Sequence, residues 1–575
     1  RMFFQYGLTI VFSVSVSLLV AITLAPMLAS RLLKYKTPTG WAIKGNMFWD
    51  QVSHAYSRLI SWAIRWRYVV IVLAIGSVFL GGWYASQIST GFLSKADRSE
   101  FLGSIELPQG TGISASQDIA LTVTNALLDI EFVDTVFISA GGGDQGKSNL
   151  LSLYVEIAPK QDRNVSQFEI MDSARQAIAN SAPMAIKTAI DEVPWVTGTS
   201  SGGFDFDLII MGPDLDQLAQ YSESIMRQME KAGSFADPRS SYEGGRPEAQ
   251  IIFDRIKAGD QAVSAKNVSL TSRIAISGMN IATYESQGRR YDVRLSLQPD
   301  QKTTARDIEP VQVSSQSGRL VDIGSVSEMI FDTGPSQIDR YDRERKISIF
   351  ASAATGVSLG DGTDDLLEIL NQNPPPKGIT FKLGGMAQYM EETAVSIGFA
   401  MLLAFVCLYM VLASQFNSMV QPLIIMVTAP LSFSGAFAAL YYFGLESSIF
   451  AQIGLIGLMG IVMKNGILLV DRANQLIRDG IAERAAIQRA GPERLRPVLM
   501  TAISAVFGMI PVALATSDGS EWRNALGALI IGGLATSTLL TLVVVPAAFM
   551  IPKDVSNLGS LMKKYLVKGQ KPAGL

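Results

Sequence analysis

The chain of 575 residues is 48% hydrophobic and 17% charged, with a positive mean hydropathy. It is too apolar for an ordinary soluble protein and too charged to lie in a membrane throughout, so we expect a mixed architecture. The net charge of −3 gives no support to nucleic-acid binding. The single cysteine, Cys407, and the single histidine, His54, argue against disulfides and against cysteine- or histidine-based metal sites. We expect no cofactor.

Seven segments are long and apolar enough to span a membrane, which takes about 20 mostly apolar residues. They are 6–29, 68–86, 394–413, 420–443, 447–470, 497–515 and 525–551, the last five forming one region at 394–551. The first run has no basic region or small-residue cleavage pattern before it, so it does not read as a signal peptide. Because Arg1 opens the chain almost directly before this run, we expect the sequence to be a piece of a longer protein.

The charge of the connecting loops predicts the orientation of these helices. Basic residues outnumber acidic ones by seven to one in 31–67, by six to four in 471–496 and by five to one in 553–575. Loops rich in Lys and Arg stay in the cytoplasm. The tail at 552–575 is therefore expected inside, and the long segment from 87 to 392 outside. We expect a multi-pass protein of a bacterial inner membrane with a large periplasmic domain.

The first cytoplasmic loop, 31–67, contains an apolar stripe with helical spacing. Its members are Phe48, Val52, Ala55, Tyr56, Leu59 and Ala63, with Trp49, Trp62 and Trp66 nearby. The stripe predicts an amphipathic helix that lies in the membrane interface. The alternative is a helix packed on a soluble partner.

The outer segment alternates strands and helices. Strands are expected at 101–107, 135–139 and 150–157, with helices at 114–130 and 167–180, the order of a split βαβ module over 92–204. A second module is expected from 205–254 and 341–390, with strands at 206–211, 249–253 and 347–351. The intervening 255–340 is expected to be an inserted domain, whose strand at 291–297 follows a turn at Ser286, Gln287 and Gly288.

The run from Gly141 to Ser148 ends in Gly-Lys-Ser and so resembles a phosphate-binding loop. Such a loop needs a helix that begins at its lysine, so that the helix N-terminus faces the phosphates. Here 150–157 alternates like a strand instead. We therefore interpret Gly141, Gly142, Gly143 and Asp144 as part of a surface loop and not as a nucleotide site.

Lys464 lies inside an apolar helical stretch, although a charge in the hydrocarbon core costs several kcal/mol unless it faces protein and pairs. Gly457 and Gly460 precede it by seven and four residues, which places all three on one helix face. Small residues allow helices to approach closely in lipid. The pattern favours a lysine that faces another helix, and the alternative is a side chain that snorkels to the cytoplasmic surface.

Several longer motifs in the second half of the chain carry a family resemblance. They are YMVLASQFNSMVQPL, APLSFSGA, GIVMKNGILLVDRANQL, RLRPVLMTA, FGMIPVAL and LGALIIGGLATSTLLTLVVVP. These runs resemble resistance-nodulation-division (RND) efflux permeases of the hydrophobe/amphiphile, multidrug branch. A weaker likeness at RYVVIVLAIG and at Phe204-Asp205-Phe206 extends the resemblance over nearly the whole chain. It implies the C-terminal half of an inner-membrane pump subunit.

The resemblance implies an α-helical polytopic bundle of seven transmembrane helices with two ferredoxin-like porter modules outside it. The insertion at 255–340 would be a docking domain. The whole protein would be a homotrimeric proton/substrate antiporter, not an enzyme. It would work in a tripartite pump with a periplasmic membrane-fusion adaptor and an outer-membrane channel, and would export amphiphilic small molecules.

The resemblance also implies a proton relay made by Lys464, Arg494 and Thr501, with acidic partners on a helix absent from this sequence. Asn465, beside Lys464, is expected to bond across helices or to turn toward the interface. Ordinary positive-inside placement remains the alternative for Arg494, and packing the alternative for Thr501.

Four outer residues match aromatic or nearby positions of the family's substrate pocket: Phe137, Phe204, Phe206 and, more loosely, Met211. The competing interpretation is core packing, because alternating Phe residues in a strand usually face a sheet core. The loop from Gly141 to Ser148 departs from the family, since drug exporters carry a phenylalanine in the corresponding loop. This departure argues against the usual spectrum of aromatic drugs.

Two other functions compete with drug efflux. A heavy-metal exporter of the same superfamily would need clustered methionines for soft metal ions, and the outer segment shows no convincing triad. A protein that only scaffolds or senses would use its buried polar residues to fix helix packing.

The relay hypothesis predicts two adjacent aspartates in an apolar helix upstream of Arg1, because the Lys464 ammonium needs carboxylate partners within the bundle. Sequencing the gene upstream of this segment is the test. An uninterrupted apolar helix in that place would contradict the hypothesis.

Overall fold

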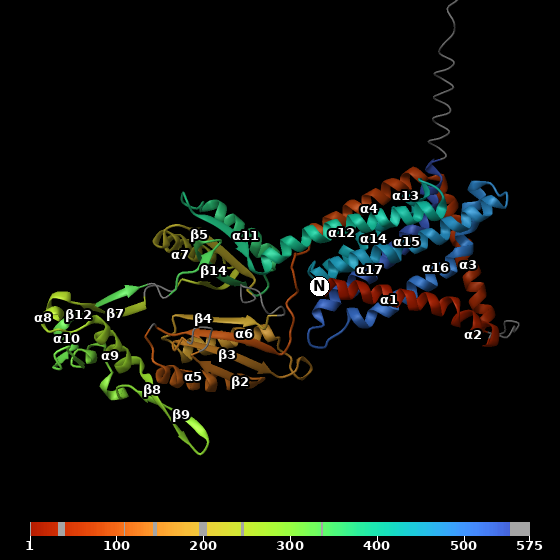
Figure 1. The fold of residues 1–575 in the computed structure, drawn as a ribbon. Coiled ribbons are helices and arrows are strands. Elements are labelled where there is room, and N and C mark those ends of the chain that lie inside the picture. The colour runs from red at the N-terminus through yellow and green to blue at the C-terminus, as the bar shows by residue number, and fades with distance from the viewer. Residues whose placement is uncertain are drawn as a thin grey trace, which may run out of the picture.

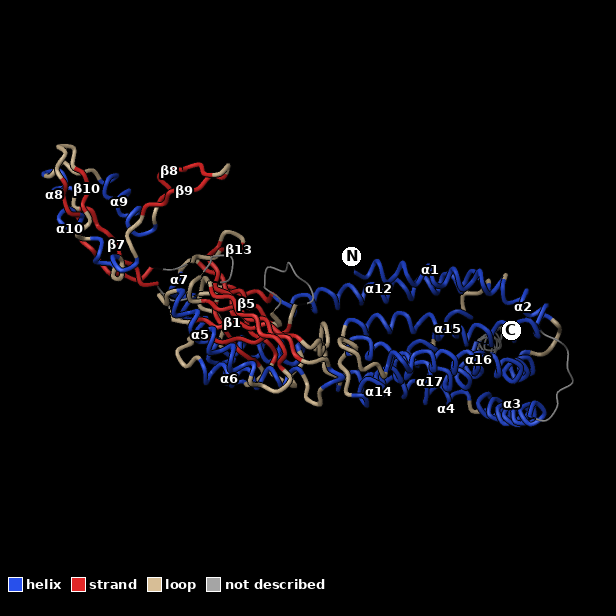
Figure 2. Tube along the Cα trace, turned by 90° about the horizontal axis from the view of Figure 1, so that it is seen from below, coloured by secondary structure: helices blue, strands red, loops and turns tan. Residues whose placement is uncertain are grey.

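The computed structural model describes residues 2–32, 41–108, 110–141, 147–194, 204–242, 246–334 and 337–552. Figure 1 shows the long helices gathered on one side, and the strands with shorter helices beside them on the other. Figure 2 shows the same division along the long direction of the molecule, with an inserted domain at the end farthest from the helices.

Apolar helices make up the bundle. The long ones are α1 (Met2–Ile22), α3 (Trp41–Arg65), α4 (Arg67–Gln87), α12 (Gly385–Phe416), α14 (Thr428–Phe443), α15 (Ile449–Arg478), α16 (Glu483–Ala513) and α17 (Glu521–Phe549), with shorter α2 (Leu24–Leu32) and α13 (Gln421–Met426). Among the described residues, seven helical spans are long and apolar enough to cross a membrane, and each overlaps one predicted segment. The predicted connection at 471–496 is largely helical, because α15 and α16 extend into it from both sides.

Close packing of α14 on α17 forms the centre of the bundle. Gly435 of α14 lies against the backbone of Gly532 on α17, and a Cβ at either position would collide with the other helix. The buried hydroxyls of Ser432 and Thr538 donate to carbonyl oxygens of their own helices, which satisfies them without water. This is the close approach that small residues permit in lipid.

The amphipathic helix predicted in the first loop is α3. Its stripe divides between two surroundings: Tyr56 and Ala63 are buried against the bundle together with Ile60, while Phe48 and Leu59 are exposed. The Tyr56 hydroxyl donates to the Leu542 carbonyl of α17 over 2.8 Å. One face of α3 therefore packs on this chain itself, an arrangement that neither predicted alternative contained.

The first outer sheet has the element order β-α-β-β-α-β. Its members are β1 (Glu100–Glu106), α5 (Ile113–Leu128), β2 (Val133–Ala140), β3 (Leu150–Ile157), α6 (Gln167–Ser181) and β4 (Lys187–Glu192). The strands lie antiparallel in the order β2-β3-β1-β4, and α5 and α6 share one apolar core with them. Residues Leu150–Ile157 form strand β3, as predicted, and not the helix that a phosphate-binding loop requires.

A second sheet repeats this element order across an insertion, with one additional short strand. It contains β5 (Phe206–Gly212), α7 (Leu215–Ala232), β6 (Phe235–Ser240), β13 (Arg340–Tyr341), β14 (Glu344–Ala353), α11 (Leu359–Gln372) and β15 (Thr380–Gly384). The strand order is β13-β14-β5-β15, and β6 also pairs with β14. The strand predicted at 249–253 does not belong to this sheet. It is part of β7 (Arg246–Phe253), which pairs with β12 (Ser327–Gly334) instead.

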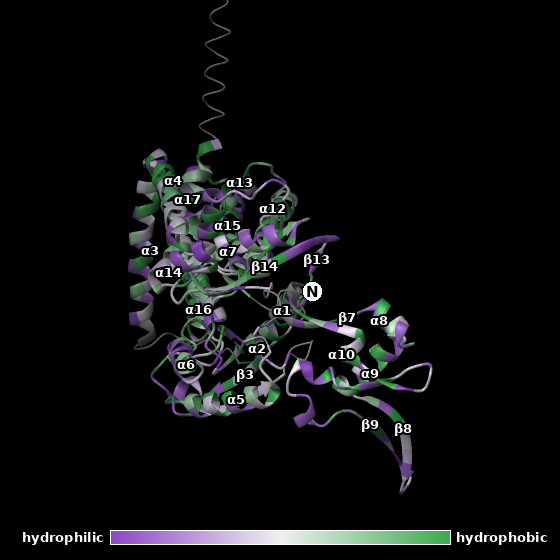
Figure 3. Cartoon of the chain, turned by 90° about the vertical axis from the view of Figure 1, so that its left-hand side faces the viewer, coloured by the Kyte–Doolittle hydropathy of each residue, from purple (hydrophilic) through white to green (hydrophobic). Residues whose placement is uncertain are grey.

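The β7–β12 pair leads to the inserted domain, which has its own core of Val268, Ile308, Val313, Ile323 and Val326. Its smaller elements are α8 (Arg255–Asp260), α9 (Ala265–Ser277), β8 (Met279–Ser286), β9 (Arg289–Leu295), β10 (Gln312–Ser314), β11 (Leu320–Asp322) and α10 (Ile323–Val326). Strands β8 and β9 form an arm that projects away from the helices (Figure 3). The predicted turn joins them, with positive φ at Gln287 and Gly288.

The packing of α14 on α17 predicts that Gly435→Ala destabilises the bundle by about 1–3 kcal/mol, because the new methyl group meets backbone as well as the Thr536 side chain. Gly398→Ala on α12 is the matched control. No described atom lies within 4 Å of that Cβ position, so the change should gain about 1 kcal/mol of helix propensity. Thermal unfolding in detergent measures both, and equal midpoints would contradict the packing argument.

Candidate functional site

The predicted relay face lies on α15 and is open in this chain. Lys464, Gly457 and Gly460 are all exposed, and no described atom lies within 4 Å of a Cβ built at either glycine. Among the described residues, no carboxylate forms an ion pair with Lys464. The opposite side of the helix is buried, including Leu458, Val462 and other apolar residues. The lysine is therefore presented on an accessible strip of an otherwise packed helix.

Asn465 points in the other direction from its neighbour Lys464. It is 4% exposed, and its side-chain amide donates to the Thr538 hydroxyl on α17 over 3.3 Å. The predicted bond across helices is present. It fixes the rotation of α15 about its axis, and so helps to keep the Lys464 face turned outward.

The two other predicted relay residues lie on α16. Arg494 is partly buried, and its Nε has no hydrogen-bond partner among the described residues. Thr501 is exposed and donates to the Val498 carbonyl of its own helix over 3.0 Å. A cross-helix ion pair between Arg472 and Glu493, 2.7 Å long, joins α15 to α16 near these positions. Among the described residues, neither Arg494 nor Thr501 forms a hydrogen bond or ion pair with Lys464.

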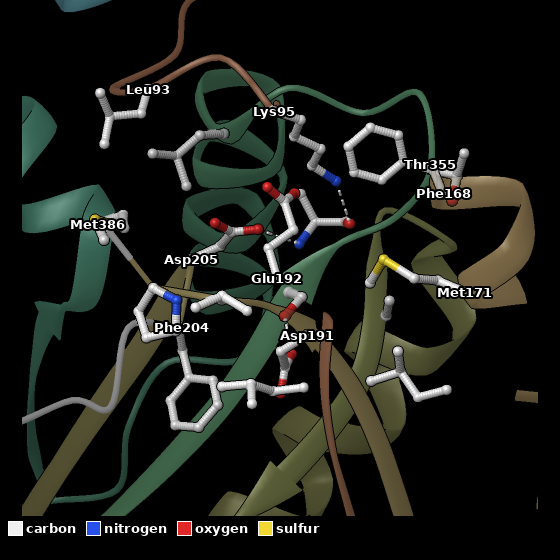
Figure 4. Close-up of a pocket in the computed structure, with 18 of the residues that line it drawn as sticks. Leu93, Lys95, Phe168, Met171, Asp191, Glu192, Phe204, Asp205, Thr355 and Met386 are labelled. Carbon is white, nitrogen blue, oxygen red and sulfur yellow. Dashed lines mark hydrogen bonds between the residues drawn. The ribbon is translucent and has the colours of Figure 1, made fainter. Parts of the chain in front are cut away.

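A second candidate site is the outer cleft, a cavity of ≈ 300 Å³ lined by both sheets, the connection from α4 to β1, and two membrane-side residues, Glu446 and Trp522. Aromatic and thioether groups line part of it, among them Phe204, Met171 and Met386. Figure 4 shows these side chains around a group of charged residues. The cleft can surround a molecule that is part apolar and part polar.

The charged group in the cleft consists of Lys95, Glu192 and Asp205. The Lys95 ammonium donates to the Ala353 carbonyl over 2.9 Å, while Asp205 accepts from the Ala353 amide over 2.8 Å. Glu192, at the end of β4, accepts from the Ala96 amide and points toward the other two in Figure 4. Three separate segments of the chain thus meet at one point.

Burial sets the protonation of these carboxyl groups. It raises the pKa of Glu192 from 4.5 to about 7, with a further increase from the nearby Asp205 and a decrease from Lys95. Burial also raises the pKa of Asp205, which the Ala353 amide and Lys95 partly offset. The pKa of Glu446 is raised in the same way. A proton at this point of the cleft is therefore exchangeable near neutral pH.

The four predicted substrate contacts lie in different places. Phe204 lines the cleft, with the Arg239 guanidinium 4.2 Å from its ring centroid. Phe206 is 1% exposed and packs edge-on against Phe235 in the core of the second sheet. Phe137 is 63% exposed on β2, and Met211 is partly buried on β5. Of the four, Phe204 alone is among the cleft-lining residues that the structure describes.

Most of the predicted glycine loop falls outside the described residues. Gly142, Gly143 and Asp144 belong to that part, so its role stays a prediction. Gly141 is described, and its φ of +79° is a conformation that favours glycine.

Sequence reasoning missed the charged group of the cleft. Asp205 lies inside the Phe204-Asp205-Phe206 motif, but that motif indicates no partner for its carboxyl group. Lys95 and Glu192 lie in ordinary polar surroundings along the chain. No local signal marks them, because the fold brings them together from distant segments.

Comparison with known proteins identifies the family. A model described as the AcrB/AcrD/AcrF family matches residues 1–553. The chain belongs to this family of RND efflux permeases. This permease chain is 27% identical over 554 residues to the multidrug resistance protein MdtC of Photorhabdus laumondii, and 26% identical over 566 residues to the swarming motility protein SwrC of Bacillus subtilis. Each alignment covers 96% of the permease chain, and 53% and 52% of those proteins.

Solved structures agree on the fold. The permease chain superimposes on a heavy-metal efflux pump in two crystal forms with a TM-score of 0.77, at 20% and 21% identity. The alignments cover 87% and 88% of this chain and 51% and 52% of the pump. The chain spans about half the length of these relatives.

The electrostatics of the cleft predict opposite shifts for two substitutions. Lys95→Met should raise the pKa of Glu192, because the lysine charge lowers it, and Asp205→Asn should lower that pKa, because the aspartate raises it. Infrared difference titration of the permease, with Glu192→Gln used to assign the carboxyl band, measures both. Shifts in the same direction, or no carboxyl titrating near pH 7, would contradict the assignment.

Proposed function

We propose that this chain is the C-terminal half of an inner-membrane RND permease that exports amphiphilic small molecules in exchange for protons. The observation that carries the proposal is the Lys464 face, a basic residue with two glycines on an open strip of an apolar helix. A lysine so placed in hydrocarbon needs carboxylate partners, and a protein surface must cover the strip. A helix from the other half of the permease supplies both.

The chemistry of this face is electrostatic. When the partner carboxylates are ionised, the Lys464 ammonium pairs with them. Proton binding neutralises the carboxylates, weakens that pair and allows the lysine to move, which links proton entry to helix movement. Arg494 and Thr501 extend the polar path along α16, and the Nε of Arg494 has no hydrogen-bond partner in the part of the chain that the structure describes.

The two outer sheets would act as porter modules of the split βαβ type, in the periplasm, above seven transmembrane helices. Their shared cleft receives the substrate, and Phe204 provides an aromatic surface inside it. The inserted domain, now including the β7–β12 pair, would dock the outer-membrane channel and the membrane-fusion adaptor of a tripartite pump. The assembled permease would be a homotrimer.

The lining of the cleft supports an amphiphilic substrate. Two methionines, Met171 and Met386, line it together with aromatic, acidic and basic groups. A soft metal ion requires several sulfur ligands at one point, whereas an amphiphile uses apolar and polar walls together. We therefore favour amphiphiles over heavy metals as cargo, although the fold is shared with a heavy-metal pump.

Substitution of Lys464 tests the proposal. In the intact permease, Lys464→Ala should reduce proton-coupled efflux of amphiphilic dyes to the background rate, because the carboxylates lose their counter-charge. Arg478→Ala, an exposed change in the last turn of the same helix, is the matched control and should leave efflux near the wild-type rate. Unchanged efflux of every compound in Lys464→Ala would contradict the relay and favour a scaffold or receptor.

A further inference from the structure

The connection between α4 and β1, residues 88–99, ties the membrane bundle to both outer sheets. On the membrane side, the Ile449 amide donates to the Phe92 carbonyl over 3.1 Å, and the Trp522 indole donates to the Ser94 carbonyl over 2.7 Å. On the outer side, the Gly360 amide of α11 donates to the Thr90 carbonyl over 2.8 Å. This connection is a fixed ribbon and holds Lys95 at a defined place.

Lys95 stands where the two sheets come together. Glu192 is the last residue of β4 in the first sheet, and Asp205 directly precedes β5 in the second. Ala353, the last residue of β14, holds both Lys95 and Asp205 through its carbonyl and its amide. Any separation of the sheets therefore moves Glu192 away from Asp205 and from Ala353.

A polar seam continues from this point between the edges of the two sheets. Asp191 of β4 pairs with Arg239 of β6 at 3.0 Å and accepts from the Ser352 hydroxyl of β14 at 2.7 Å. Arg175 of α6 bonds Asp237 of β6 at 3.2 Å. These bonds are made across the seam rather than within one sheet. The contact between the sheets is polar, and such a contact opens at a lower cost than an apolar one.

The charges that face Glu192 and Asp205 come from every element at this point. They are Lys95 on the connecting ribbon, Asp191 on β4, Arg239 on β6, Glu446 between α14 and α15, and Asp361 on α11, which faces Glu446. Arg239 is engaged by Asp191. Lys95 is therefore the cation shared by three carboxyl groups, which cannot all ionise cheaply while the sheets are together.

We propose that Glu192 and Asp205 form a proton-operated latch, which holds the two outer sheets together over the cleft while it is protonated and releases them when it ionises. The latch faces the outer side of the permease and is separate from the Lys464 face in the bundle. The inference rests on the proposed function only for its purpose, which is to open and close a substrate cleft.

The direction of the response follows from linkage. In the arrangement seen here the pKa of Glu192 is about 7, whereas a carboxyl exposed by separation of the sheets returns toward its ordinary value of 4.5. The closed arrangement therefore binds the proton more tightly, so acid favours it. The factor by which protonation favours the closed arrangement over the separated one decreases roughly tenfold per pH unit between the two pKa values, 4.5 and about 7. Above about pH 7 this factor is lost.

The test measures the distance between the sheets in the intact permease as a function of pH. Spin labels are placed at Thr122→Cys on α5 and Gln220→Cys on α7, both exposed positions, with Cys407 and other native cysteines replaced by serine. Double electron–electron resonance between pH 5 and 8 should show a second, separated population that grows with pH and becomes constant above about pH 7.

Substitutions decide whether the latch residues cause this change. Glu192→Gln, a neutral isostere of the protonated group, should keep the closed distance at every pH. Lys95→Met should move the transition to higher pH. Glu223→Gln, an exposed change on α7, is the matched control and should leave the transition in place. A Glu192→Gln permease that retains the wild-type transition, or a wild-type distance independent of pH, would overturn the latch.

Dye efflux by the same variants and by Lys464→Ala separates the latch from the proposed function. If the distance fails to respond to pH while efflux proceeds and depends on Lys464, the latch is wrong and the antiporter proposal stands. If the distance responds as expected while Lys464→Ala transports normally, the latch stands and the relay is wrong.

Discussion

The cost of an ammonium group in hydrocarbon is the constraint on which the arrangement of this bundle depends. Lys464 can occupy the middle of α15 if the helix turns it toward a polar partner and away from lipid. The Asn465–Thr538 bond holds α15 in one rotation against α17, and the close contact of Gly435 with Gly532 holds α17 against α14. The packed core thus determines the direction in which the open Lys464 face points. In the proposed function, a helix from the other half of the permease covers this face.

In the two outer sheets, too, the cost of removing charge from water constrains the structure, but there the charged groups are carboxylates. Glu192 and Asp205 are carboxyl groups that the fold removes from water, and their raised pKa values are the consequence. In the bundle a cation exposed on an apolar helix calls for carboxylates, and in the cleft partly buried carboxyls surround a single lysine. In the proposed function both places exchange protons, because neither can hold all of its charges at once. The ribbon at 88–99 joins the two, since it is bonded to the outer ends of the bundle and carries Lys95.

Helices and strands could be predicted wherever the spacing of apolar residues along the chain shows which side of the element is buried. Strand β3 alternates apolar and polar residues, and its predicted and observed bounds agree. The strand at 249–253 was also recognised, but it was given to the wrong sheet, because alternation defines a strand and not its partner. Helix α3 showed its apolar stripe, yet the burial of Ile60 against the bundle depends on the position of α16 and α17.

The same distinction explains which parts of the candidate site could be foreseen. Lys464 is conspicuous because its apolar neighbours make a charge expensive, so one stretch of sequence contains the signal. Lys95 and Glu192 are polar residues among polar residues, and their energetic cost arises from the contact of two sheets. Phe204 and Phe206 make the point within one motif: the two residues are equivalent in sequence, yet β5 directs Phe206 into the core while Phe204, just before the strand, faces the cleft. A site formed between domains can therefore be recognised in the sequence only where one of its residues differs in polarity from its neighbours along the chain.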